Sequence, residues 1–349
     1  MTLTRLAPRF DGEGRITFAE HTYRDPGPGE LLLRVEANAV CGTDREQYYS
    51  GSQVTPGHEA VGRVAAVGPD TRVAEGTRGA VFLMDYCGQC RSCRLGHTNQ
   101  CLAKRADMGF TADGGYGPYE LVHESNFFPV PDEVTASEAT LLLDVMGTSG
   151  HAIRRARRVR PDIESVYIAG AGPIGLGLLV VARLTLGAEV PIYISDLSPW
   201  RIEYAAELGG IPVAADGSSQ PLSDIDVAFD STGNADARRV ALDALGKRGV
   251  LVCVGHGSSL ALDVSRDLIA PERSVLGSEY FRYDELPANL ELLLAHRAEL
   301  GKVITHTFDV VDLAEAFETF LTGRSGKVVV TQQDTAHQEG PAAQENTVA

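Results

Sequence analysis

Basic side chains are scarce in this chain of 349 residues. Its 31 lysines and arginines face 47 aspartates and glutamates, so the formal net charge is −16 at pH 7. A surface with this surplus of negative charge repels the phosphates of nucleic acids and of anionic lipid headgroups. We therefore expect neither nucleic acid nor a membrane as a partner.

Long apolar runs are also absent. No segment approaches the ~20 apolar residues of a membrane-spanning helix, and the N-terminus lacks the apolar stretch of a secretion signal. These absences predict a cytoplasmic protein. The chain has only six cysteines. Six cysteines allow three disulfides in a secreted protein, but in a cytoplasmic chain clustered cysteines more often bind metal or take part in chemistry.

The length and composition indicate a globular protein with more than one domain. Hydrophobic residues make up 44% of the chain and charged residues 22%, which is typical of soluble domains. A chain of 349 residues exceeds one ordinary core and suits two domains. Residues 1 to about 145 are β-rich, with Gly, Pro and Asp turns between short apolar segments. We expect strands there at residues 30–35, 60–67, 79–84 and 119–122.

The pattern changes to alternating strands and helices between about residues 147 and 275. A strand at 166–169 is followed by the motif G-x-G-x-x-G and a helix at 176–184. The glycines permit a tight turn and a close backbone approach to a pyrophosphate, which the helix N-terminus attracts. We expect a dinucleotide to bind here; the alternative is a glycine-rich turn without a nucleotide. The predicted contact residues are Gly170, Gly172, Pro173, Ile174 and Gly175.

The next predicted strand, 191–195, ends in Asp196. This acid follows Gly175 by about 20 residues, the spacing expected for a carboxylate that binds the adenosine ribose hydroxyls. Because Asp196 would repel a 2′-phosphate, we expect NAD rather than NADP as the cofactor. Arg201 is a second candidate cofactor contact that would soften this repulsion, although its position in the sequence favours the helix surface.

The later elements complete the predicted fold. Helices at 199–208 and 235–245 alternate with strands at 226–230 and 249–254, which indicates a doubly wound parallel sheet. Two helices, at 283–296 and 313–321, then precede a strand at 327–331. This last part is too short to fold alone, so we expect it to rejoin the N-terminal domain. The predicted domains are therefore 1–146 with 276–331, and 147–275, followed by a disordered tail at 332–349.

Four cysteines lie within a short segment, at Cys87, Cys90, Cys93 and Cys101. Thiolates on such tight turns can close a tetrahedron around one Zn²⁺ with no open position, which is a structural site. An iron–sulfur cluster is the alternative, but the wide last gap and the absence of a following proline count against it. We therefore predict a structural zinc.

A second group of candidate ligands is mixed in type. Cys41 lies in Cys-Gly-Thr-Asp, and His58 and Glu59 lie in Gly-His-Glu-Ala-Val-Gly. A thiol, an imidazole and a carboxylate with one position left for water or substrate are what a catalytic zinc needs. Taken singly, Cys41 could instead be a small buried residue, and His58 a hydrogen-bonded loop histidine.

Together these motifs resemble the zinc-dependent medium-chain alcohol dehydrogenases, from about residue 25 to about residue 331. The resemblance implies an α/β protein with a β-rich GroES-like catalytic domain and a Rossmann cofactor domain. It implies two zinc ions per chain, NAD, a small-molecule alcohol substrate and a homodimer or homotetramer. It also fits Gly326-Lys327-Val328-Val329 near the end, and we include Lys327 among the candidate cofactor contacts.

The resemblance assigns further roles. Cys41, His58 and Asp144 would bind the catalytic zinc, with Glu59 as an exchanging ligand or a residue behind it. For Asp144 alone, a helix-capping role is the alternative. Thr43 would pass the alcohol proton outward, and Thr148 would touch the nicotinamide.

One departure from the family pattern bears on the substrate. Glu46 stands where many relatives have a histidine at the outer end of the proton path, and we include it as a candidate catalytic residue. The sequence Cys-Gly-Thr-Asp-Arg-Glu is similar to the sugar (glucose) dehydrogenase branch, which favours a polyol, sugar or cyclitol. Two alternatives are a zinc-free quinone or enone reductase of the same fold, and a non-catalytic zinc-stabilised nucleotide-binding protein.

Overall fold

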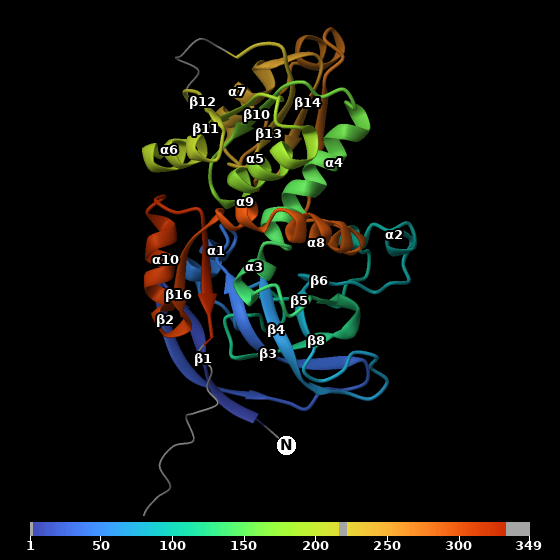
Figure 1. Cartoon of the computed structure of the whole chain (residues 1–349), viewed down its shortest axis with the longest axis vertical. Helices are drawn as coiled ribbons and strands as arrows, with labels where there is room; N and C mark the ends of the chain where they lie inside the picture. Colours follow the sequence, from blue (N-terminus) through green and yellow to red (C-terminus); the bar gives the residue numbers. More distant parts are fainter. Residues whose placement is uncertain (1–2, 216–221, 333–349) are drawn as a thin grey trace, which may run out of the picture.

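The computed structural model describes residues 3–215 and 222–332, which form two large sheets and two small ones. In Figure 1 the sheet of the middle segment lies at the top with its helices, and the mainly N-terminal sheet lies at the bottom. Two helices drawn in orange lie between them, α8 (Leu286–Ala295) and α9 (Arg297–Gly301).

The upper sheet is parallel and doubly wound, as the sequence predicts. Its six strands have the order β12-β11-β10-β13-β14-β15. The order reverses between β10 and β13, and in such sheets ligands bind outside the carboxyl ends of the strands at this point. The strands are β10 (Val166–Ala169), β11 (Ile192–Ser195), β12 (Ile211–Pro212), β13 (Ile225–Asp230), β14 (Leu245–Cys253) and β15 (Ser274–Gly277).

Alternate side chains of β10 point to opposite faces of this sheet. Val166 and Ile168 belong to an apolar core that includes residues of α5, whereas Tyr167 and Ala169 belong to a core that includes residues of α7. Because both faces are covered, β10 is an unbroken apolar run. The helices of this part are α4 (Ser149–Val159), α5 (Pro173–Leu186), α6 (Pro199–Glu207) and α7 (Ala235–Asp243).

The lower sheet has seven strands, in the order β16-β17-β3-β4-β5-β9, with β8 paired to β3. Strands β16 and β17 come from the C-terminal part of the chain. β17 pairs antiparallel with β3, with Val329 opposite Ala39. The strands are β3 (Glu30–Ala39), β4 (Ala60–Val67), β5 (Arg78–Val81), β8 (Tyr119–His123), β9 (Phe127–Pro129), β16 (Ile304–Asp309) and β17 (Lys327–Thr331). Helices α3 (Ala136–Thr140) and α10 (Leu313–Leu321) belong to the same half of the molecule.

Several predicted elements differ from the structure. The first residues form a hairpin that we did not predict, and the strand expected at 79–84 is broken into β5 and a short β6. The helix expected at 283–296 begins as a 3₁₀ turn (Tyr283–Glu285), because Pro287 in the first turn of α8 has no N–H to continue the α-helical bonds back to residue 283. The elements concerned are β1 (Leu3–Gly12), β2 (Arg15–Tyr23), β6 (Met84–Asp85) and its partner β7 (Ala106–Asp107).

The predicted tail begins one residue too early. Gln332 donates its side-chain amide to the carbonyls of Tyr116 and Gly117, and its backbone N–H to Glu36. These bonds fix Gln332 beside the lower sheet. The rest of the predicted tail, residues 333–349, lies outside the described residues.

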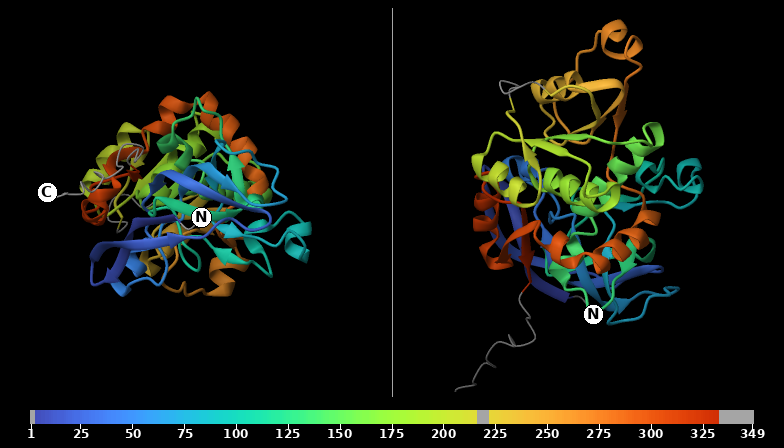
Figure 2. Two further views of the ribbon diagram at one scale, coloured as in Figure 1. Left: turned by 90° about the horizontal axis from the view of Figure 1, so that it is seen from below. Right: turned by 45° about the horizontal axis from the view of Figure 1, so that its top comes forward.

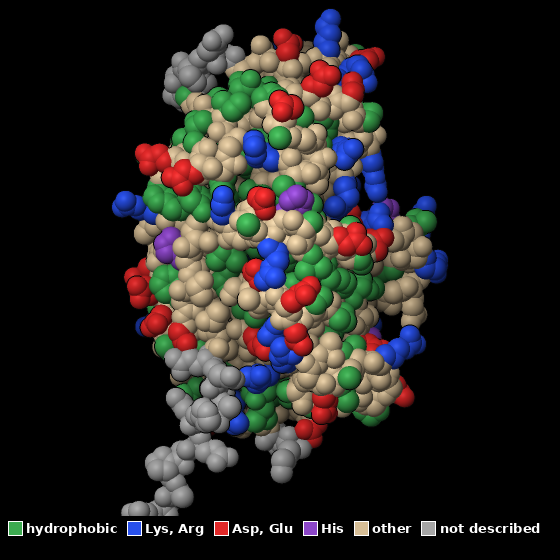
Figure 3. All heavy atoms as spheres, in the orientation of Figure 1, with side chains coloured by type: hydrophobic (Ala, Val, Ile, Leu, Met, Phe, Trp, Pro, Cys, Tyr) green, Lys and Arg blue, Asp and Glu red, His purple; other side chains and the backbone are tan. Residues whose placement is uncertain are grey.

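The surface shows no segregation of charge on the face drawn in Figure 3. Acidic and basic side chains are interspersed there, with hydrophobic atoms between them. None of the helices in the described ranges is long and apolar enough to cross a membrane.

The buried carboxyl of Glu120 gives a testable prediction about stability. Within the described part of the chain neither of its oxygens has a hydrogen-bond partner, and burial, followed by Asp113, raises its pKa well above 4.5. The folded carboxyl therefore keeps its proton to a higher pH than the unfolded one, and the protein loses stability as pH rises above about 4.5.

We expect Glu120→Leu to raise the free energy of unfolding at pH 8 by about 2 kcal/mol, because it removes an unpaired polar group. The gain should shrink as pH falls towards 5. Urea unfolding of both proteins at the two pH values measures it, and an equal gain at both values would contradict the assignment.

Candidate functional site

Four buried side chains meet in the lower half of the molecule. These are Cys41, His58, Glu59 and Asp144, and one ligand atom of each lies within 4.8 Å of the others. Cys41 follows β3, and His58 and Glu59 precede β4, which is the neighbour of β3 in the sheet. Asp144 comes from a short π-helix (Asp144–Thr148) that leads into α4. The fold thus brings together the mixed ligand set that the sequence predicts.

The side chains are turned towards one another. Cys41 Sγ lies 3.0 Å from Asp144 Oδ2, and His58 Nε2 lies 3.6 Å from the same oxygen. His58 Nδ1 lies 3.1 Å from Asp44 Oδ1. A carboxylate on one ring nitrogen fixes the orientation of a ligating histidine and leaves the other nitrogen for the metal.

These residues fit a zinc ion. Zinc ligands lie at about 2.0–2.3 Å from the metal, so in a tetrahedron the donor atoms are roughly 3.3–3.8 Å apart, close to the distances here. Burial raises the pKa of the Cys41 thiol, and Asp144 raises it further. Burial would also raise the pKa of Asp144, but His58 and Lys327 hold it below its ordinary value. A divalent cation would offset the cost of keeping thiolate and carboxylate together.

Lys327, a predicted cofactor contact, lies beside Glu59. Its ammonium contacts Glu59 Oε1, and both side chains are fully buried. Burial raises the pKa of Glu59 to about 8, while Lys327 opposes this shift. Lys327 is therefore a partner of Glu59 beside the metal ligands, and its role as a cofactor contact stays a prediction. The other oxygen of Glu59 has no partner among the described residues, which leaves it free to reach a metal.

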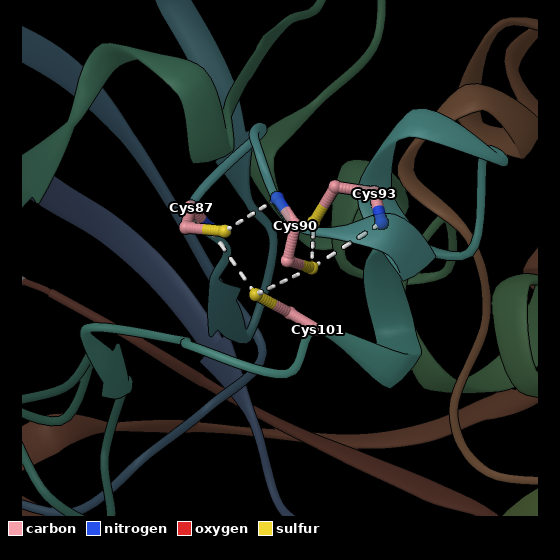
Figure 4. Close-up of side chains that lie close together, drawn as sticks. All are labelled: Cys87, Cys90, Cys93 and Cys101. Carbon is pink, nitrogen blue, oxygen red and sulfur yellow. Dashed lines mark hydrogen bonds between the residues drawn. The ribbon is translucent and has the colours of Figure 1, made fainter.

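The four clustered cysteines form a second group, shown in Figure 4. Cys90 Sγ lies 3.5 Å from Cys93 Sγ and 4.0 Å from Cys101 Sγ, close to the edge of a zinc–thiolate tetrahedron, about 3.8 Å. None of the four is in a disulfide. The backbone N–H groups of Cys93 and Leu102 lower the pKa of Cys90 to about 6. The cluster fits the predicted structural zinc.

The glycine-rich turn lies at the carboxyl end of β10. Gly170 has φ of +96°, and a Cβ at Gly175 would lie 1.9 Å from the Gly170 carbonyl oxygen. Only glycine is accommodated at both positions, so the turn can close tightly and the N-terminus of α5 remains free to face a phosphate. Pro173 and Ile174 form the half-buried first turn of α5.

Asp196 lies beside this turn, at the end of β11. Its two oxygens accept the backbone N–H groups of Ala171 and Ser198, each at 2.8 Å. Arg201 donates a hydrogen bond to the Ser325 carbonyl. Its guanidinium would lie 3.6 Å from a Cβ added at Gly172. Its side chain is therefore packed next to the turn and not on the helix surface that we favoured.

The remaining predicted residues lie around these groups. Thr43 Oγ1 is 3.5 Å from His58 Nε2. Thr43 is exposed to solvent. Glu46 is exposed on α1 (Asp44–Ser50), and Thr148 is buried at the end of the π-helix. Thr43 thus lies between the metal ligands and solvent.

Sequence reasoning missed Asp44 as part of the site. This buried carboxylate lies beside His58 Nδ1 and accepts hydrogen bonds from the Cys41 N–H and the Tyr116 hydroxyl. Its position three residues after a candidate ligand cysteine was the available signal. The ring of Phe110 also lies against His58, with the ring centroids 5.0 Å apart and the planes tilted by 35°.

Comparison with known proteins agrees with this geometry. Residues 27–132 match the alcohol dehydrogenase GroES-like domain, and residues 173–295 match the zinc-binding dehydrogenase domain. The L-threonine 3-dehydrogenase of Stenotrophomonas maltophilia is 30% identical over 88% of this chain and 93% of its own length. The chain belongs to the zinc-type medium-chain alcohol dehydrogenase family.

Two other similar proteins cover almost the whole of the present chain. The uncharacterized zinc-type alcohol dehydrogenase-like protein YphC of Escherichia coli is 27% identical over 95% of the chain and 99% of its own. The structure of acetophenone reductase from Geotrichum candidum, in complex with NAD, is 27% identical with a TM-score of 0.82, over 94% of this chain and 97% of that one. The chain is thus a dehydrogenase of the zinc-binding type, and two groups of its side chains could each hold a metal ion.

Proposed function

We propose that the enzyme transfers hydride between NAD and a secondary alcohol, and that its substrate is a polyol, sugar or cyclitol. The observation that carries this proposal is the buried group of Cys41, His58 and Asp144, which has the solvent-facing hydroxyl of Thr43 beside it. Such a ligand set suits a metal that binds a hydroxyl, and Thr43 offers that hydroxyl a route for its proton.

Cys41, His58 and Asp144 would hold the zinc, and the turn from Gly170 to Gly175 would hold the NAD pyrophosphate. When bound, zinc lowers the pKa of a coordinated hydroxyl and NAD accepts a hydride. Thr43 Oγ1 would take the hydroxyl proton and pass it outward to solvent near Glu46, while Asp44 keeps His58 in orientation. The division of the chain into domains 1–146 with 276–331 and 147–275 is part of this proposal: a catalytic part and a cofactor part then face each other.

The substrate class has two lines of support. The segment from Cys41 to Glu46 resembles the sugar dehydrogenase branch, and its exposed carboxylate at Glu46 can accept hydrogen bonds from a polyhydroxy substrate. One relative has the name L-threonine 3-dehydrogenase, and the hydroxyl of L-threonine is a secondary one. A zinc-free reductase and a non-catalytic nucleotide-binding protein both leave this ligand set without a use.

Turnover on a panel tests the substrate class. NADH formation is followed by absorbance with simple primary and secondary alcohols, polyols, sugars, cyclitols and L-threonine, using zinc-loaded protein. We expect turnover that is fastest on a polyol, sugar or cyclitol. Faster turnover of L-threonine or of simple alcohols would contradict the substrate class, and no turnover on any member would contradict the catalytic proposal.

The choice of NAD over NADP gives a prediction for Asp196. In Asp196→Asn the side chain keeps its shape and its one oxygen can still accept the Ala171 N–H, but it loses the hydrogen bond from the Ser198 N–H and the charge that would repel a 2′-phosphate. We expect kcat/KM with NADP to rise about tenfold and that with NAD to fall, because one charge near the phosphate is removed. Arg201→Gln, measured in parallel, should weaken binding of both cofactors. An unchanged NAD-to-NADP ratio in Asp196→Asn would contradict this role for Asp196.

We also propose that the enzyme is a homodimer or homotetramer. Within the described residues β15 is the last strand of the cofactor sheet and pairs only with β14, and Val264 and Ile269, which precede it, are 54% and 66% exposed. An unpaired edge next to exposed apolar side chains favours association. Light scattering should give two or four chains per particle for the parent and fewer for Val264→Asp/Ile269→Asp. A monomeric parent would contradict the proposal.

A further inference from the structure

Residues 279–285 carry the chain from the last strand of the cofactor sheet to α8, and they pass the catalytic group on the way. The Phe281 ring is fully buried and lies against Gly147, where an added Cβ would be 2.3 Å from the ring. Gly147 belongs to the π-helix that supplies Asp144 and Thr148. This return segment, residues 279–285, therefore forms a wall against the helix that carries a metal ligand.

The far end of the return segment is fixed to α4. Glu285 accepts from His151 Nδ1 at 3.0 Å and from Arg154 Nε at 3.0 Å, and both residues lie on α4. Near its other end, the Tyr280 hydroxyl accepts a hydrogen bond from the Leu83 N–H at 3.4 Å. Displacement of the segment would thus be felt by the π-helix, which leads directly into α4.

The cysteine lobe, residues 87–101, holds the segment at two points, its first residue and Tyr283. Asn99 Nδ2 donates to the Glu279 carbonyl at 2.7 Å, and the Tyr283 N–H donates to Thr98 Oγ1 at 2.8 Å. Both side chains are buried, whereas the lobe itself projects from the side of the molecule around α2 (Arg91–Arg94), as both views in Figure 2 show. The lobe stands away from the main body but contacts the segment beside the catalytic group.

The lobe has little apolar core of its own. Its helix α2 has no buried residue, and its 3₁₀ turn (Thr98–Gln100) lies between Cys93 and Cys101 of the cysteine cluster. The position of Thr98 and Asn99 is therefore set mainly by the four cysteines and the zinc that they fit.

We propose that Thr98 and Asn99 are positioning residues: from the cysteine lobe they hold the return segment against Gly147, and so keep the catalytic ligand helix in place. The lobe then serves catalysis through two hydrogen bonds in addition to stabilising the fold. This inference rests on the proposed function for its kinetic consequence, but not for its structural one.

The experiment uses the full-length, zinc-loaded protein and its variants Asn99→Ala and Thr98→Val. Leu95→Ala is the matched control, because Leu95 lies in the same lobe and is 62% exposed. Three quantities are measured: hydrogen exchange of residues 279–285, zinc content, and kcat and KM on the best substrate. Small displacements in an active site cost rate steeply.

In both variants we expect several-fold faster exchange in residues 279–285, a kcat about tenfold lower with a smaller change in KM, and unchanged zinc content. Leu95→Ala should match the parent. Unchanged exchange, or faster exchange with unchanged kcat, would overturn the proposal. Loss of zinc with faster exchange throughout 87–101 would also overturn it, because the side chains would then serve the lobe itself. A parent without turnover would contradict the proposed function, while the exchange data would still test whether the lobe holds the segment.

Discussion

Asp144→Ala and Cys41→Ser are each expected to remove one zinc ion per chain and to lower kcat/KM on the order of a thousandfold or more, because the metal that binds the substrate hydroxyl is lost. The thiol and the carboxylate lie 3.0 Å apart and are both buried. Removing either leaves two of the three ligands expected to hold the ion, whereas catalytic zinc keeps three, and Glu59, the remaining carboxylate, is already paired with Lys327. Metal analysis and NADH formation, measured on the same samples, test both effects.

The control for these variants is Cys253→Ser, a half-buried strand cysteine that belongs to neither metal group. It should keep both zinc ions and its activity. If Asp144→Ala kept full zinc content and activity, the alternative helix-capping role of Asp144 would be favoured. Zinc loss without loss of activity would contradict a catalytic role for the metal.

The second large effect concerns the glycine-rich turn. Gly175→Ala is expected to weaken NAD binding at least about a hundredfold, because the added Cβ would lie 1.9 Å from the Gly170 carbonyl oxygen and the backbone must move. That movement displaces the turn and the first N–H groups of α5, the groups expected to face the pyrophosphate. Fluorescence titration with NADH measures the dissociation constant.

Gly277→Ala is the matched control for the turn. Gly277 lies in the same sheet, on β15, and no atom lies within 4 Å of a Cβ added there. It should bind NADH as the parent does. Equal affinities of Gly175→Ala and the parent would show that the cofactor does not bind at this turn.

The central strands of the cofactor sheet, β10 and β13, could be predicted closely from the sequence because they are almost completely buried, whereas the exposed or half-buried edge strands β12 and β15 were missed. β10 was predicted with its observed bounds. In the other half of the molecule, α10 and β17 also have the predicted bounds. The β1–β2 hairpin was missed: most of its residues are exposed or half-buried, and the hydrophobic pattern that marks a strand is weak there. Elements that owe their existence to packing on neighbours are less visible in sequence than elements that form the core.

The candidate site was only partly predictable. Cys41, His58 and Glu59 lie in recognisable motifs, but Asp144 is far from them in sequence and was found through the family resemblance. The contact of Lys327 with Glu59 joins the two ends of the chain, and no local pattern announces such a pair. The glycine spacing indicates what the turn can bind, whereas the packing of Arg201 beside it depends on the loop at Ser325.

The most direct test of the account is anomalous X-ray diffraction at the zinc edge from crystals grown with zinc and NAD. Two zinc peaks per chain are expected. One is bounded by Cys41, His58 and Asp144 and faces the nicotinamide, and the other lies among the four clustered cysteines. A single peak at the cysteine lobe, with none at Cys41 in zinc-loaded protein, would contradict the catalytic site.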